Sequence, residues 1–284
     1  MMTLEEILTL PVEKLADHAR VGVKIYPTRE ALFEGFAREI AEEIKSHNAR
    51  GEPTRLILPV GPTGQYPILV EICNRERISW KNVWTFNMDE WLDWQGRPLP
   101  PDHPLSFEGY MRRQVFERLD PDLRIPDDHI IFPHPFRIDE LSEKIRQVGG
   151  IDTCYGGIGY HGHVAFNEPW YSQWQRPSLD EFRHSKTRVV PLHPDTIVVN
   201  SITSADGNFM AIPPMAVTMG MEDILSARRL RFYVFAGERH KTIFRIALMG
   251  EVSTEFPVTL LQEHPDCVIA ADEYTAQPVR VGIR

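Results

Sequence analysis

Hydrophobic residues recur along the chain with two spacings, one typical of amphipathic helices and one typical of short buried strands. Leu32, Phe36 and Ile40 follow one another every four residues after Thr28, a residue that can cap a helix. A polar segment with turn-forming residues, 48–53, interrupts this pattern. The spacing therefore predicts a long helix between Thr28 and this segment.

The same alternation of helices and strands continues toward the C-terminus. Further helices are predicted over residues 68–77, 107–119, 139–148 and 240–249. Buried strands are predicted over residues 55–60, 83–87, 129–132, 151–155, 187–192, 216–219, 231–236 and 267–271. Strands separated by helices indicate an α/β fold with a mostly parallel sheet and helices on both faces. No segment has the composition of a linker, so we expect one domain over residues 1–284, with 1–27 as an N-terminal extension.

Composition and charge exclude several classes of protein. The 284 residues include 31 Lys and Arg against 40 Asp and Glu, and the net charge of −9 disfavours binding to nucleic acid and anionic membranes. The cysteines Cys73, Cys154 and Cys267 are widely spaced, which favours neither a disulfide framework nor a CxxC metal site. The first 20 residues lack the basic stretch of a signal peptide, and no apolar run has the length of a membrane span. A cytoplasmic location is expected.

Three segments at predicted strand ends carry residues suited to chemistry. They are GPTGQYP (61–67), NMDEW (87–91) and GGIGYHGHVAFNE (156–168). In a parallel α/β sheet, ligands bind beyond the carboxyl ends of the strands, where such segments converge. The first of them, with Gly61 and Gly64 before a helix, fits either backbone binding of an anion or an ordinary tight turn.

The NMDEW segment places Asp89 and Glu90 side by side. If the chain is extended there, the two side chains point in opposite directions and only one faces a given site. A carboxylate in a dry cleft has a raised pKa and can act as a general base. A solvated acidic loop is the alternative reading of this pair.

The third segment is the most specific of the three. It combines His161, His163 and Glu168 with several glycines that let the backbone approach a ligand: Gly156, Gly157, Gly159 and Gly162. A histidine can transfer protons near neutral pH, and a carboxylate on its second ring nitrogen sets the tautomer. The segment is therefore a candidate for proton-transfer chemistry on a small polar molecule.

The His-x-His pattern also suits a divalent metal ion. Such a site needs a third protein ligand, for which the candidates are His103, His134, Asp89 and Glu168. Spacing alone leaves this alternative open.

Two of these segments resemble the signatures of the glucosamine-6-phosphate deaminase/isomerase family. FNMDEW (86–91) and GGIGYHGHVAFNEP (156–169) are similar to that family's patterns, and the likeness extends over roughly residues 28–275, with a wider relation to 6-phosphogluconolactonases. The resemblance implies a modified Rossmann-like α/β fold, no metal, no other cofactor, and a homo-oligomer. It also implies a reaction in which an amino-sugar phosphate undergoes ring opening, aldose–ketose isomerisation and loss of ammonia.

The resemblance assigns roles to individual residues. Asp89 matches the base that moves a proton between C2 and C1 of the sugar, His163 the histidine that assists ring opening, and Glu168 the carboxylate that supports this histidine. His161 stands where the family has an aspartate and is taken as a further catalytic candidate. The candidate substrate-binding residues are Pro62, Thr63, Gly64, Gln65, Tyr66, Glu90, Gly157, Gly159, Gly162, Ile202, His240 and Lys241.

The phosphate subsite departs from the family pattern. Gln65 and Tyr66 replace smaller residues of the glycine loop, Ile202 replaces an arginine, and His240 occupies the place of a lysine, with Lys241 one position late. Charge-assisted hydrogen bonds give a phosphate clamp its strength, so we expect poor use of glucosamine 6-phosphate and action on a related sugar, such as one without the 6-phosphate.

Two other functions stay open. One is a sugar lactonase or another hydrolase on the same scaffold, in which His163 activates water. The other is a catalytically silent sugar-binding relative. The long aromatic loop 168–182 is expected to be either a lid or a subunit contact.

Overall fold

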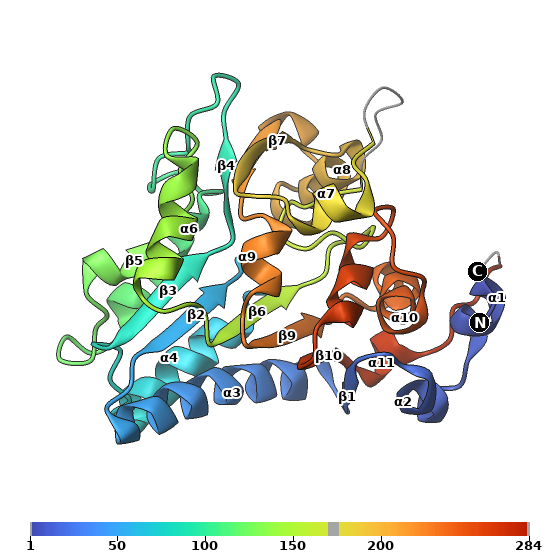
Figure 1. Cartoon of the computed structure of the whole chain (residues 1–284), viewed down its shortest axis with the longest axis horizontal. Helices are drawn as coiled ribbons and strands as arrows, with labels where there is room; N and C mark the ends of the chain where they lie inside the picture. The colour runs from blue at the N-terminus through green and yellow to red at the C-terminus, as the bar shows by residue number, and fades with distance from the viewer. Residues whose placement is uncertain (1, 170–175, 283–284) are drawn as a thin grey trace.

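A seven-stranded parallel sheet forms the centre of the molecule (Figure 1). The computed structural model describes residues 2–169 and 176–282. The strands, in spatial order, are β1 (Gly22–Tyr26), β10 (Cys267–Asp272), β9 (Arg229–Val234), β6 (Thr153–Gly157), β2 (Thr54–Leu58), β3 (Val83–Asn87) and β5 (Ile130–Ile131). Every neighbouring pair is parallel. The predicted α/β class is confirmed.

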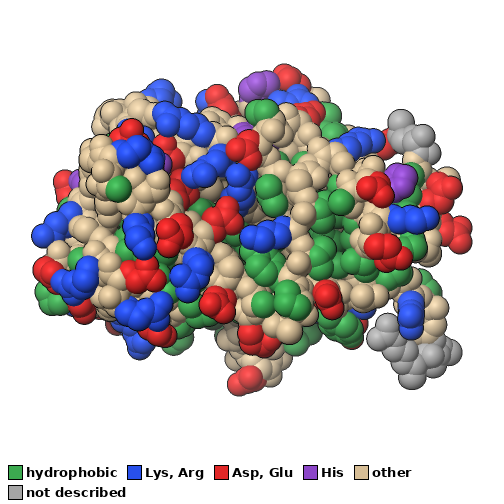
Figure 2. All heavy atoms as spheres, turned by 90° about the horizontal axis from the view of Figure 1, so that it is seen from below, with side chains coloured by type: hydrophobic (Ala, Val, Ile, Leu, Met, Phe, Trp, Pro, Cys, Tyr) green, Lys and Arg blue, Asp and Glu red, His purple; other side chains and the backbone are tan. Residues whose placement is uncertain are grey.

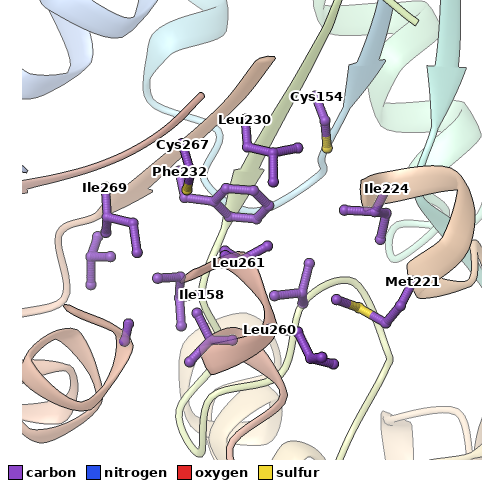
Figure 3. Close-up of a cluster of buried hydrophobic side chains, with 14 of the residues drawn as sticks. Cys154, Ile158, Met221, Ile224, Leu230, Phe232, Leu260, Leu261, Cys267 and Ile269 are labelled. Carbon is purple, nitrogen blue, oxygen red and sulfur yellow. The ribbon is translucent and has the colours of Figure 1, made fainter. Parts of the chain in front are cut away.

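Helices cover both faces of this sheet, and each face has its own hydrophobic core. One face carries α3 (Arg29–Arg50), α4 (Gln65–Glu76) and α5 (Phe107–Gln114). The other carries α1 (Leu4–Thr9), α2 (Leu15–His18), α6 (Ile138–Gln147), α9 (Met221–Leu225) and α10 (Lys241–Met249). Figure 3 shows Leu230 and Phe232 of β9 in this second core with Leu260 and Leu261 of the 3-10 helix Pro257–Glu263.

The helix ends explain where the predicted boundaries were right and wrong. The hydroxyl of Thr28 accepts a hydrogen bond from the backbone N–H of Ala31, as expected of a cap, and α3 ends at Gly51 in a left-handed conformation (φ 69°). The helix predicted over 107–119 instead stops at Gln114, because Val115 leaves the helical region (φ −125°). On the outer side of α3 and α4, acidic and basic side chains are interspersed (Figure 2).

The N-terminal segment is part of the sheet, whereas the sequence reading treated 1–27 as an extension. Residues 22–26 form β1 at the sheet edge beside β10. The guanidinium of the buried Arg245 on α10 donates hydrogen bonds to the carbonyls of Ile7 and Leu10. Alternating exposure along β1 weakens its hydrophobic signal, which explains why the pattern missed it.

A second, antiparallel sheet lies above the carboxyl end of the parallel one (Figure 1). It consists of β4 (Asp89–Leu92), β8 (Met215–Thr218) and β7 (Arg188–Pro191), in that order. Strands near 187–192 and 216–219 were predicted, but their place in a separate sheet was not, because an apolar segment in the sequence does not show which strand it pairs with. The helices α7 (Leu179–Arg183), α8 (Pro194–Ser204) and α11 (Glu273–Ala276) complete the described fold. None of the described helices combines the length and apolar character that crossing a membrane requires.

Candidate active site

The strands β2, β3, β6 and β9 end at one pocket, at the edge of the sheet that the sequence singled out. Its volume is about 700 Å³. Each of the three candidate segments contributes to its lining: Pro62 and Thr63 follow β2, Asp89 follows β3, and Gly157 ends β6. The pocket is large enough for a sugar phosphate, and its floor comes from strand ends, which hold side chains rigidly.

Asp89 is a buried carboxylate that faces this pocket. It is the first residue of β4, one residue beyond the end of β3, and 7 % of its surface is exposed. Its carboxylate accepts no hydrogen bond from the described part of the chain. Burial raises the pKa of Asp89 well above its usual range, and the nearby negative charge of Glu90 adds to this rise. Asp89 therefore holds a proton more readily than an ordinary carboxylate, as suits a general base.

Glu90 points away from the pocket to the start of α5. Its carboxylate accepts hydrogen bonds from the backbone N–H groups of Phe107 (3.0 Å) and Glu108 (2.8 Å) and from the hydroxyl of Ser106 (3.0 Å). Successive side chains of a strand point to opposite faces, so the extended conformation of β4 separates the two carboxylates. Glu90, expected to bind substrate, instead stabilises a helix N-terminus.

The glycine turn after β6 brings the backbone against the loop after β2. A methyl group at Gly157 would lie 2.4 Å from the carbonyl oxygen of Gly61, so only a glycine permits this approach. A methyl group at Gly159 would lie 1.9 Å from Nε2 of His163. His163 lines the pocket, whereas His161 and Glu168, which face its Nδ1, do not, so we infer that Nε2 is the nitrogen on the pocket side of the ring.

The other nitrogen of His163 faces a cluster of polar groups. Nδ1 of His163 lies 3.1 Å from Nε2 of His161 and 3.6 Å from Oε1 of Glu168. Nε2 of His161 lies 4.0 Å from the same Glu168 oxygen. Glu168 accepts hydrogen bonds from the backbone N–H of His193 (2.5 Å) and from the hydroxyl of Thr196, both at the start of α8.

Burial controls the charge of this cluster. It raises the pKa of Glu168 to about 7, against the opposing effect of the hydrogen bonds from Thr196 and His193. It lowers the pKa of His161 to about 4 and that of His163 well below its usual range, and the neighbouring histidines add to the second shift. The two imidazoles are therefore neutral at pH 7.

Asn167 holds the end of this segment in place. Its side-chain amide is fully buried and donates hydrogen bonds to the carbonyls of Val164 (3.0 Å) and Met219 (2.8 Å), while its oxygen accepts one from Arg188 (2.8 Å). The backbone N–H of Phe166 donates to the hydroxyl of Thr218. Residues 166 and 167, just before Glu168, are therefore held against β7 and β8 of the small antiparallel sheet.

Several predicted binding residues lie outside the pocket lining. Gln65 and Tyr66 are fully buried, and their side chains donate hydrogen bonds to the carbonyls of Pro62 and Pro59, under the loop they were expected to obstruct. The expectation that these two side chains meet the phosphate was wrong, because the first turn of α4 directs them into the core. Among the other candidates, those not lining the pocket are Gly64, Glu90, His161, Gly162, Glu168, Ile202 and Lys241.

The altered phosphate positions also have new surroundings. Ile202 on α8 is 66 % exposed, and the ammonium of Lys241 lies over the ring of Tyr274 at 4.2 Å from its centre. His240 does line the pocket, and burial lowers its pKa to about 4. None of these three side chains brings a positive charge to the pocket at neutral pH.

Two arginines that sequence reasoning missed line the pocket instead. Arg29 opens α3, directly after β1, and its guanidinium lies over the rings of Phe33 and Phe235. Arg239 follows β9. An assignment of β1 would have placed Arg29 at the carboxyl edge of the sheet, so the missing strand concealed this residue. Further polar lining that was not predicted comes from Ser106, Tyr110, Thr196, Asn200, Thr203 and Ser204.

Some of the candidate metal-binding residues lie close together, and others do not. His161, His163 and Glu168 offer ligand atoms within 4.8 Å of one another, as do His161, His193 and Asp195. His103, His134 and Asp89, the other candidate ligands, join neither group within the described residues. The aromatic residues at 170–175, part of the loop expected to be a lid or contact, lie outside the described residues.

Comparison with known proteins identifies the family to which the chain belongs. The chain is 32 % identical over 265 residues to a glucosamine-6-phosphate deaminase of Parabacteroides distasonis, covering 91 % of both chains. It is 33 % identical to that of Porphyromonas gingivalis, covering 91 % of this chain and 94 % of the relative. The chain belongs to the glucosamine-6-phosphate deaminase family. No family model matched it.

Solved structures of a deaminase and of a lactonase share the fold of this chain. A monomeric glucosamine-6-phosphate deaminase superposes with a TM-score of 0.77 at 27 % identity, covering 90 % of this chain and 99 % of the other. A 6-phosphogluconolactonase from Trypanosoma cruzi shares the fold with a TM-score of 0.64 at 17 % identity, covering 90 % of this chain and 96 % of the other. The deaminase reading is supported more strongly than the lactonase one, and the predicted enzyme class is confirmed.

Proposed function

We propose that this enzyme converts a phosphorylated 2-amino sugar to a ketose phosphate and ammonia, with Asp89 as the base. The observation that carries the proposal is the buried Asp89 carboxylate in the same pocket as Nε2 of His163. Asp89 takes the proton from C2 of the open-chain sugar and returns it to C1, while a proton passes from the ammonium group to O1. The resulting iminium carbon at C2 adds water and expels ammonia. Asp89 serves both proton transfers between C2 and C1, because its raised pKa lets it accept a proton and hold it until it is returned.

His163 assists ring opening in this proposal. Its Nε2 lies on the pocket side and moves a proton between the anomeric hydroxyl and the ring oxygen. Its Nδ1 lies 3.1 Å from Nε2 of His161, and the hydrogen bond between these two nitrogens sets the tautomer of the ring. His161 thereby takes the position that an aspartate has in the family pattern, and it acts as a positioning residue.

Arg29 and Arg239 bind the phosphate of the substrate in this proposal. The expectation of poor activity on glucosamine 6-phosphate rested on the loss of cations at Ile202 and Lys241. Two guanidinium groups in the pocket lining offset that loss, and arginine forms bidentate hydrogen bonds with phosphate oxygens. The phosphate subsite is thus altered in its residues but retains its charge.

Ammonia and acid release, measured in parallel, test the function. We expect ammonia from glucosamine 6-phosphate, much less from glucosamine, and no acid from 6-phosphogluconolactone. Arg29→Ala and Arg239→Ala should each raise KM for the phosphorylated sugar about 10–100-fold. Arg38→Ala, on the exposed side of α3, is the control. Acid release without ammonia would establish the lactonase alternative. Equal rates of ammonia release from glucosamine 6-phosphate and glucosamine would show that the enzyme does not recognise the phosphate.

Two further expectations stay predictions. The homo-oligomer expected from the family resemblance is testable by light scattering, and one structural neighbour is described as monomeric. The cytoplasmic location is testable by cell fractionation.

A further inference from the structure

The distances within the His161, His163 and Glu168 cluster do not fit a hydrogen-bonded relay. Only the two histidine nitrogens, at 3.1 Å, lie within hydrogen-bonding distance of each other. Oε1 of Glu168 is 3.6 Å from one and 4.0 Å from the other, which is too long for a hydrogen bond. The side chain of Glu168 is only 8 % exposed, and this oxygen faces two rings without bonding to either.

The same distances fit the coordination shell of a metal ion. A point equidistant from the three atoms lies about 2.1 Å from each, which is the usual length of zinc–nitrogen and zinc–carboxylate bonds. We propose that His161, His163 and Glu168 bind a zinc ion between Nε2, Nδ1 and Oε1. Two imidazoles and one carboxylate form a donor set that zinc accepts, and three protein ligands leave a position for water or a substrate oxygen.

The surroundings of Glu168 support the role of a ligand. The hydroxyl of Thr196 donates to Oε1 and the backbone N–H of His193 donates to Oε2. Ligating carboxylates in proteins are commonly held by such outer hydrogen bonds, which fix their orientation. Both donors belong to the start of α8, so the position of the carboxylate is set by a helix rather than by the glycine turn.

The neighbouring group of His161, His193 and Asp195 is the weaker candidate. Nδ1 of His193 already accepts a hydrogen bond from the backbone N–H of Asp195, as the cap of α8. The side chain of Asp195 is 51 % exposed, so water competes for its carboxylate. We therefore assign the ion to the inner group, next to the pocket.

The residue that completes the donor set is the one that departs from the family pattern. The family resemblance implied no metal, with an aspartate at the position of His161. An imidazole at this position supplies a nitrogen ligand of the kind that zinc prefers. Zinc on Nδ1 of His163 fixes the proton of the ring on Nε2, the nitrogen on the pocket side, from which it can be donated to the ring oxygen of the sugar.

Metal binding by the full chain, after removal of any affinity tag, tests the proposal without substrate. Protein stripped with a chelator is titrated with zinc in competition with a chromophoric indicator, and the zinc content is measured by mass spectrometry. We expect one zinc per chain and a rise in Tm on addition of zinc. The cobalt-substituted protein should show the visible absorption of a four-coordinate site.

Two ligand variants and a matched histidine variant make the result specific. His161→Gln and Glu168→Gln should each weaken zinc binding at least about 100-fold. His134→Gln, a loop histidine outside both clusters, should bind as the unaltered protein does. Near-ultraviolet circular dichroism verifies that the variants are folded. Substoichiometric zinc in the unaltered chain, or undiminished binding by both ligand variants, overturns the proposal. Loss of deaminase activity alone bears on the proposed function and not on the metal site.

Discussion

Two neighbouring segments at the carboxyl edge of the sheet present their polar groups in different ways. In β4, regular strand geometry sends Asp89 into the pocket and Glu90 to the N-terminus of α5. In the glycine turn, no such alternation exists, and the side chains of His161 and His163 contact each other. Adjacent residues therefore have separate roles in the first segment, whereas residues two apart act together in the second.

The difference predicts how each segment responds to substitution. In β4, activity and stability should separate between the two carboxylates, because only one of them faces substrate. In the glycine turn, both properties should depend on the same side chains. Four predictions follow from this contrast, from the largest effect to the smallest.

Asp89→Asn should lower kcat by about 10²–10⁴-fold, because it removes the proposed base. Its free energy of unfolding should stay the same or rise, since a buried carboxylate without a hydrogen-bond donor is replaced by a neutral amide. Steady-state ammonia release and urea unfolding measure the two effects. A stable variant with normal kcat would show that Asp89 is not the base.

Gly159→Ala should lower kcat/KM by about 10²-fold, because the added methyl group displaces the His163 ring from its position. Gly282→Ala is the control, since a methyl group there meets nothing within 4 Å. The crystal structure of the Gly159→Ala variant should show that the His163 ring has shifted. Unchanged kinetics with a shifted ring would exclude a role for Nε2 in the reaction.

Glu90→Gln should destabilise the fold by about 1.5–3 kcal/mol, because three backbone N–H groups, of Trp91, Phe107 and Glu108, lose a charged acceptor. Activity per folded molecule should persist. The control is Glu108→Gln, which removes only a part-exposed ion pair with Arg112. Equal unfolding midpoints for the two variants would contradict the capping role of Glu90.

Glu168→Gln should flatten the dependence of stability on pH in metal-free protein. The folded pKa of Glu168 is about 7 against an ordinary value of 4.5, so its stabilising contribution is complete below 4.5 and is lost as the pH rises through 7. The unaltered chain should thus lose roughly 2–3 kcal/mol relative to the variant between these limits. Parallel stability curves from urea unfolding with chelator present would refute the raised pKa.

Local patterns in the sequence were enough for five helices, α3, α4, α5, α6 and α10, and for most strands of the parallel sheet, but not for α8, which lines the pocket. The cap at Thr28 and the spacing after it placed α3, and the opposite directions of Asp89 and Glu90 followed from an extended backbone. The segments with specific chemistry also converged on one pocket, because parallel strands end at one edge.

Contacts distant in sequence limited the rest. β4 follows β3 after a single residue and pairs with β8, more than 120 positions later along the chain, so a local pattern could not separate the two sheets. The buried positions of Gln65 and Tyr66 depend on carbonyls of the preceding loop. The location of Arg29 in the pocket lining could be inferred only once β1 was known to belong to the sheet.

The fate of the hydrogen at C2 tests the central claim most directly. Glucosamine 6-phosphate with deuterium at C2 is incubated with the unaltered enzyme and with Asp89→Asn, and nuclear magnetic resonance follows C2 and C1 while ammonia is measured. We predict that the unaltered enzyme removes the deuteron from C2 as fast as it releases ammonia, and that Asp89→Asn leaves it in place. Loss of the deuteron at an undiminished rate in Asp89→Asn would contradict the assignment of Asp89 as the base.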